Sequence, residues 1–333
     1  MRRWTSMLGV LLLALAVVGV QMAATAAGKA FYLTQLTMTA YSTMVVIGLS
    51  LVMGYAGQIS LGHGAFFAIG GYASAALTTR DLGSMLPPAV VEPLLRGGLL
   101  VARTDMYGGE LVSCAPWLAF AAALGLAALV AAFIGFPALR LKGHYLAMGT
   151  LGFGLIVYRV FLGTEWLGGA DGIVSVPPLR LFGALEIAGG RALRLQNYYI
   201  AWGLLVVVVG LLVNLTGSRI GRALHSIHDS ELAANAMGIN TAAYKLKVFV
   251  LSAVLAAMAG SLMTHYNGGI APTEAGVMRS VRYETLVAAG GMASIRGALA
   301  VGAVLTFLYL RGGFGTFDHA VFGALLLGIM SFG

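Results

Sequence analysis

The chain has 333 residues, of which 59% are hydrophobic and only 10% are charged. Soluble domains carry about 25% charged residues, so this composition excludes a water-soluble fold with a charged surface. The net charge of +8 comes from lysines and arginines in short gaps between apolar runs, which indicates contact with lipid headgroups and not with nucleic acid. The composition therefore predicts an all-α fold, a polytopic transmembrane helix bundle formed by residues 1–333 as a single domain.

Long apolar runs predict where the chain crosses the membrane. About 20 apolar residues span a bilayer as a helix. By this measure we expect about 8–10 membrane segments, over residues 7–27, 31–53, 58–78, 117–139, 145–162, 198–215, 248–266, 283–292, 297–310 and 320–332. The segments 283–292 and 297–310 are expected to meet at a cytoplasmic turn.

The first apolar run has two interpretations. Residues 7–27 follow Arg2 and Arg3, and they end near Ala24-Thr25-Ala26, which resembles a signal-peptidase site. We favour a retained helix over a cleaved signal peptide. Both interpretations place Gly28 and Lys29 outside, so the topology of the later segments is the same in either case.

Basic residues between the apolar runs predict the orientation. An N-terminus on the cytoplasmic side places most of the basic clusters near helix ends inside, as the positive-inside rule requires. These are Arg140, Lys142, Arg219, Arg222, Lys245, Lys247 and Arg296. The two predicted outer loops, 79–116 and 163–197, carry arginines together with acidic residues. The cytoplasmic segment 216–247 is the longest on its side and is expected to be helical.

A glycine-rich polar block follows the predicted membrane segment 31–53. Residues 54–72 contain six glycines within 18 residues, with Gln58, Ser60 and His63 between them at membrane depth. Polar groups in the hydrocarbon core need partners or a wet cavity. The block is therefore either a tight helix contact with satisfied polar groups or the lining of a translocation path. The path candidates are Gln58, Ser60, His63, Phe66 and Glu284.

Residues 218–240 predict a short amphipathic helix between two membrane segments. The stretch from Asp229 to Met237 favours a helix, and Gly238 followed by Asn240 is typical of a helix end. The helix is expected either to lie on anionic lipid or to dock a soluble partner, with Ala223 among the small residues of its docking face.

Common catalytic and nucleotide-binding motifs are missing from the sequence. The chain has no Gly-x4-Gly-Lys-Ser/Thr loop, no His-Glu-x-x-His motif and a single cysteine, Cys114, so we predict neither an ATP site nor an enzyme. His225 and His228 stand near Asp229, but a third nitrogen or sulfur ligand is missing, so no metal site is expected.

Three ordered blocks resemble one family. The stretch Glu231-x-Ala-Ala-x3-Gly238 is similar to the coupling loop of bacterial ABC importer permeases. Together with residues 54–67 and 139–154, it resembles the branched-chain amino-acid permease family, in its LivM-type membrane subunit. The resemblance covers residues 30–78 and 117–333.

The resemblance implies an importer half in the bacterial inner membrane. It implies a second, paralogous permease subunit, two cytoplasmic ATPase subunits that bind ATP and magnesium, and a periplasmic substrate-binding protein. No cofactor is expected in this chain. The residues implied in ATPase coupling are Arg222, Ala223, Leu224, Ile227, Glu231, Ala233, Ala234, Met237 and Gly238.

Two other functions remain open at this point. The same family includes permeases for urea and short amides, and residues 222–240 look closer to the amino-acid branch. An autonomous secondary transporter or channel would predict an inverted repeat and intramembrane charge pairs, and the sequence has no convincing repeat and few such charges.

Overall fold

The computed structural model describes residues 2–84, 87–104, 110–139, 141, 143–181, 185–313, 315–317, 320–324 and 327–328. Within these residues, six helices are long and apolar enough to cross a membrane. They are α1 (Arg2–Ala26), α2 (Tyr32–Ala56), α5 (Pro116–Ala138), α6 (His144–Gly163), α7 (Arg194–Gly217) and α10 (Thr241–Asn267). The predicted all-α, multi-pass membrane fold is confirmed.

Three further helices complete the described part of the bundle. They are α3 (His63–Thr79), α11 (Val277–Gly290) and α12 (Ile295–Leu310), of which α12 is a shorter apolar helix. The predicted turn between 292 and 297 is confirmed, because α11 ends at Gly290 and α12 begins at Ile295. The predicted segment 320–332 lies largely outside the described residues, as do Arg140 and Lys142.

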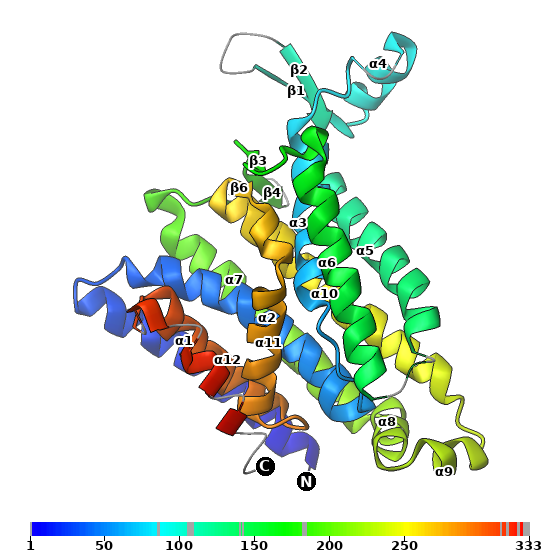
Figure 1. Cartoon of the computed structure of the whole chain (residues 1–333). Helices are drawn as coiled ribbons and strands as arrows, with labels where there is room; N and C mark the ends of the chain where they lie inside the picture. Colours follow the sequence, from blue (N-terminus) through cyan, green and yellow to red (C-terminus); the bar gives the residue numbers. More distant parts are fainter. Residues whose placement is uncertain are drawn as a thin grey trace.

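The two ends of the bundle carry different structures (Figure 1). One end, here named the hairpin end, carries the short elements α4 (Pro88–Arg96), β1 (Leu100–Thr104), β2 (Glu110–Cys114), β3 (Ile173–Val174), β4 (Leu179–Leu181), β5 (Leu185–Ile187) and β6 (Gly269–Ile270). The opposite end, the α8–α9 end, carries α8 (Arg219–Asp229), α9 (Glu231–Ala236) and the N-terminus. The regions 79–116 and 163–197 thus share one end, and 216–247 lies at the other.

The region 79–116 contains more structure than the predicted loop. Its strands β1 and β2 pair antiparallel, with Leu100 opposite Cys114, and α4 precedes them. In 163–197, β4 pairs with β5, while β3 pairs with the distant β6. The 3₁₀ turns Glu165–Leu167, Arg191–Leu193, Pro272–Ala275 and Gly315–Phe317 complete the irregular parts.

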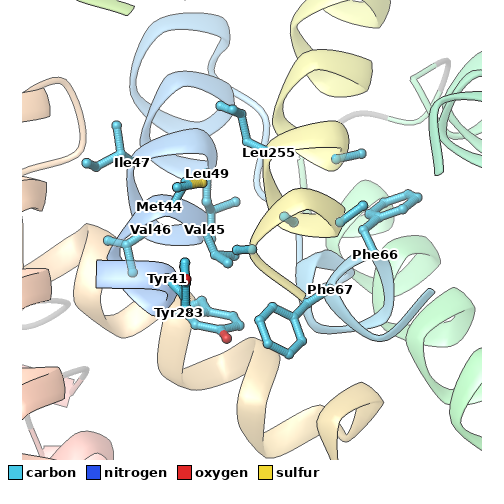
Figure 2. Close-up of a cluster of buried hydrophobic side chains, with 14 of the residues drawn as sticks. Tyr41, Met44, Val45, Val46, Ile47, Leu49, Phe66, Phe67, Leu255 and Tyr283 are labelled. Atoms are coloured by element: carbon cyan, nitrogen blue, oxygen red, sulfur yellow. The ribbon is translucent and has the colours of Figure 1, made fainter. Parts of the chain in front are cut away.

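The core lies where α2, α3, α10 and α11 meet. Figure 2 shows Tyr41 and Met44 of α2 facing Phe67 of α3, Leu255 of α10 and Tyr283 of α11. Helix α2 is buried on every side from Thr39 to Ala56. Its apolar stretch is 89% buried, compared with at most 67% for the other candidate membrane-spanning helices, so α2 is the central helix among them.

Glycine allows α3 and α10 to touch along their backbones. A Cβ atom at Gly70 would overlap the backbone of Ala257, and one at Gly260 would overlap the carbonyl group of Phe67. Small residues bring membrane helices into this kind of backbone contact. The glycine-rich block therefore fixes the distance between α3 and α10.

Candidate functional site: a buried polar segment and a coupling surface

The segment between α2 and α3 breaks the helix that the sequence analysis placed at 58–78. Helix α2 ends at Ala56, it is followed by Gly57, whose φ of +64° favours glycine, and α3 begins only at His63. Residues 57–62 form neither helix nor strand, and in Figure 1 they rise from the α8–α9 end into the bundle. The predicted membrane segment is therefore a non-helical stretch followed by a 17-residue helix.

Side chains from three other helices satisfy the polar groups of this stretch. The imidazole of His63 lies 3.2 Å from Ser60 Oγ through Nδ1 and 2.7 Å from Ser252 Oγ on α10 through Nε2. The Leu61 N–H donates to Thr150 Oγ1 on α6 at 3.0 Å, and the Gly64 N–H donates to Ser280 Oγ on α11 at 3.2 Å. Buried peptide groups in a membrane need such partners.

The structure brings four of the five path candidates together and separates the fifth. Gln58, Ser60, His63 and Phe66 are all buried inside this chain. Glu284 lies apart from them on α11 and is partly exposed. Both interpretations of the block apply to the isolated chain: the polar groups are largely satisfied, and the helix is broken. Gln58 Oε1 and the hydroxyl of Tyr72 are the exceptions, since neither has a hydrogen-bond partner among the described residues.

A second buried histidine ties α10 to the hairpin end. His265 Nδ1 donates to the carbonyl oxygen of Pro177 at 2.6 Å, so its Nε2 accepts a hydrogen bond from Ser74 Oγ of α3, also at 2.6 Å. His265 was not among the residues predicted from the sequence. It could have been found as a histidine inside an apolar helix, where its ring needs hydrogen-bond partners.

The predicted coupling helix is two helices. Ser230 has an extended backbone with a φ of −158°, and its side chain caps α9 by accepting a hydrogen bond from the Ala233 N–H at 3.3 Å. Helix α8 ends at Asp229 before this cap, so the prediction of one amphipathic helix in residues 218–240 was wrong. The predicted stop is confirmed: Gly238 has a φ of +83°, and Asn240 caps α10.

Charge and hydrogen bonds hold α9 against the start of α10. Glu231 Oε2 lies 2.7 Å from Lys245 Nζ. The hydroxyl of Thr241 lies 3.2 Å from Glu231 Oε1 and 3.1 Å from Asn235 Oδ1. Glu231 thus fixes the position of α9 through its own chain.

The predicted coupling residues divide into a buried and an exposed set. The buried set packs α8 and α9 onto the bundle and contains Leu224, Ile227 and Ala234. The partly or fully exposed set contains Arg222, Ala223, Glu231, Ala233, Met237 and Gly238. Leu232 was not among the predicted residues, yet it is 80% exposed, and Met237 is 83% exposed. Leu232 could have been found in the sequence as a large apolar residue in a short helix that was expected to dock a partner.

Helix α8 also contacts the beginning of the buried polar segment. The ring of His225 lies 5.0 Å from the ring of Tyr55 near the end of α2. A Cβ at Gly57 would lie 3.1 Å from Nδ1 of His228. A displacement of α8 would therefore act directly on the turn from which residues 57–62 depart.

Comparison with known proteins finds similar permease proteins of branched-chain amino acid transport systems. Residues 31–330 match the family described as the branched-chain amino acid transport system permease component. The chain is 31% identical to the high-affinity branched-chain amino acid transport system permease protein LivM of Escherichia coli, over 88% of this chain and 67% of that protein. It is 25% identical to LivH of Salmonella typhimurium, over 79% of this chain and 78% of that protein.

The matches extend to a sugar permease, the fructose import permease protein FrcC of Rhizobium meliloti, at 26% identity over 66% of this chain and 55% of that protein. No solved structure matches the chain. The family match covers nearly the whole chain, and it includes α2 and α3 with the broken segment between them as well as α8 and α9. The chain belongs to the branched-chain amino acid permease family.

Proposed function

We propose that this chain is the membrane-spanning permease subunit of a bacterial ABC importer for branched-chain or related amino acids. The observation that carries the proposal is the α8–α9 surface. Its apolar side chains Leu232 and Met237 extend away from a bundle that already buries Leu224, Ile227 and Ala234. Exposed apolar groups on a membrane protein's polar end favour a protein partner.

The partners follow from the family. We propose two ATPase subunits docked on the α8–α9 surface, which bind ATP and Mg²⁺ themselves. A second, paralogous permease subunit would complete the translocation path, and the similarity of this chain to both LivM and LivH supports that pairing. A periplasmic substrate-binding protein would deliver the substrate at the hairpin end.

The orientation follows from charge. We propose that the α8–α9 end and the N-terminus face the cytoplasm and that the protein lies in the inner membrane. Arg219, Arg222, Lys245 and Lys247 belong to α8 and to the first turns of α10, and Arg296 begins α12. Lysine and arginine within short cytoplasmic connections are what the positive-inside rule favours.

The mechanism uses the contact of α8 with the end of α2. ATP-driven closure of the ATPase subunits would push on α9 and α8. Through the contacts of His225 with Tyr55 and of His228 with Gly57, the push would reach residues 57–62. These residues lack helical hydrogen bonds, so they can change conformation without breaking a helix. The membrane helices would then alternate between inward-facing and outward-facing states.

The substrate assignment rests on the relatives' names. The family description and the LivM and LivH relatives concern branched-chain amino acids, whereas FrcC is named for fructose. We propose uptake of branched-chain or related amino acids and keep urea or short amides of the same family as the alternative. Uptake of labelled leucine, fructose and urea by the assembled importer separates these cases.

Charged residues on the α8–α9 surface test the docking proposal. In cells expressing the assembled importer, Leu232→Asp or Met237→Asp should abolish ATP-dependent leucine uptake and co-purification of the ATPase subunits. Val90→Asp, at a 42% exposed position of α4 at the opposite end, is the matched control and should leave co-purification of the ATPase subunits unchanged. Normal uptake in both α9 variants, with normal membrane insertion, would show that the ATPase subunits dock elsewhere.

A further inference from the structure

A polar cavity opens at the hairpin end, away from the α8–α9 surface and from the buried polar segment. Its volume is about 470 Å³, and it lies between the end of α3, the β1–β2 hairpin and residues 172–175. Thr78 and Ser113 form its buried floor, and Arg80 and Arg103 stand on its walls, partly exposed. Small-ligand sites are concave and combine a few placed polar groups with a volume of this order.

Two buried polar atoms of the cavity residues have no partner. The hydroxyl of Ser113 is 2% exposed, and its Oγ has no hydrogen-bond partner among the described residues. The same holds for Nε of Arg80, although its Nη2 donates to the carbonyl oxygen of Trp166. Buried polar groups are rarely left without a hydrogen bond. The two atoms lie beneath the cavity surface, so each could pair with a ligand once its side chain turns toward the cavity.

The positive charge of the cavity is also uncompensated by the described residues. Among the described residues, neither Arg80 nor Arg103 forms an ion pair. Burial, and then the nearby positive charge of Arg180, lowers the pKa of the Arg103 guanidinium. The carboxylate of Asp81 is engaged elsewhere, because its Oδ1 accepts hydrogen bonds from the backbone. An anion in the cavity would therefore relieve repulsion between Arg103 and Arg180.

We propose that this cavity binds the carboxylate group of the transported amino acid. The guanidinium groups of Arg103 and Arg80 would pair with the carboxylate oxygens, and the Ser113 hydroxyl would donate to one of them. Guanidinium matches the geometry of a carboxylate. This inference rests on the proposed function, and it adds the residues that recognise the substrate where it enters the chain.

The neighbouring cavity supports an amino acid over a simple anion. It has a volume of about 360 Å³ and shares Ile173 and Val174 with the first cavity. Its walls include the apolar side chain of Phe67 and the carboxylates of Asp171 and Glu274. Asp171 forms no ion pair with the described residues. A carboxylate suits an ammonium group, and apolar walls suit a branched side chain.

Binding to the detergent-purified full chain tests this assignment without any partner. The probes are 4-methylpentanoate, which has the carboxylate of leucine but no ammonium group, 3-methylbutylamine, which has the reverse, and inorganic phosphate at equal ionic strength. We expect 4-methylpentanoate to bind most tightly of the three. Loss of a charge-assisted hydrogen bond in Arg103→Gln should raise its Kd by about 10- to 100-fold, and Ser113→Ala should raise it by about five-fold.

Arg96→Gln is the matched control, because Arg96 lies at the same end but pairs with Glu92 on the exposed face of α4. It should leave the Kd unchanged. Equal binding of the amine, tighter binding of phosphate, or an unchanged Kd in Arg103→Gln would overturn the assignment. Leucine uptake by the assembled importer is measured separately: its absence would refute the proposed function, whereas the binding result on the chain concerns the cavity alone.

Discussion

The ion pair between Glu231 and Lys245 should set the local stability of α9. The two groups are 2.7 Å apart, and their side chains are 32% and 13% exposed. Fully exposed pairs contribute about 0.2–1 kcal/mol, and breaking a buried pair costs about 3–5 kcal/mol. An intermediate exposure predicts a loss of about 2 kcal/mol in Glu231→Gln, which corresponds to about 30-fold more frequent opening of α9.

Hydrogen exchange of the α9 amides in the detergent-purified chain measures this opening directly. Glu92→Gln is the matched control, because its pair with Arg96 is 3.9 Å apart and about four-fifths exposed, so exchange in α4 should change by less than about fivefold. The charge swap Glu231→Lys with Lys245→Glu should restore most of the protection. Unchanged α9 exchange in Glu231→Gln would refute the view that this pair holds α9 in place.

Three further changes probe other parts of the structure. Gly260→Leu should destabilise the chain by about 1–3 kcal/mol in thermal unfolding, because its side chain would overlap the α3 backbone, whereas substitution of the uncrowded Gly203 should be tolerated. Ser252→Ala should cost about 1 kcal/mol in the same assay, since His63 loses a buried partner at 2.7 Å. Hydrogen bonds from backbone N–H groups, first that of Val112, hold the pKa of the Asp81 carboxyl below its usual range. The stability that these bonds give the hairpin is therefore fully present at a pH above the pKa of Asp81 in the unfolded chain, and it is lost as the pH falls through the lower pKa of the folded chain. Protection of the β2 amides from hydrogen exchange, corrected for the intrinsic effect of pH on exchange, should fall on acidification in the native chain but not in Asp81→Asn. In each of the three assays, the opposite result would contradict the contact that the variant removes.

Hydrophobic run length predicted the helices well but their ends less well. The predicted segment 31–53 corresponds to α2, Tyr32–Ala56, and 198–215 falls within α7. Helix α10 begins at Thr241, seven residues before its apolar run, because Asn240 caps a first turn that is followed by Lys245 and Lys247. Hydropathy reports contact with lipid, whereas a helix continues until its backbone hydrogen bonds end.

Long-range contacts were beyond reach of the sequence. Ser252 lies 189 residues from His63, and no local pattern indicates that the two side chains meet. The hairpin of β1 and β2 is likewise fixed by pairing across five residues each, too short for a clear alternating pattern. For the coupling surface, sequence resemblance identified the right segment, but only burial separated Leu224, which faces the bundle, from Leu232, which faces away.

The non-helical residues 57–62 have a mechanical consequence for α6. Six residues reach at most about 20 Å, and the 17 residues of α3 add about 26 Å, so part of the path through the bundle is formed by chain without a helical hydrogen-bond ladder. The Leu61 amide depends on Thr150 for its partner. Any movement of residue 61 must therefore carry this part of α6 with it or leave the Leu61 N–H without a hydrogen-bond partner, so a conformational change in residues 57–62 should be accompanied by a shift of α6 at Thr150.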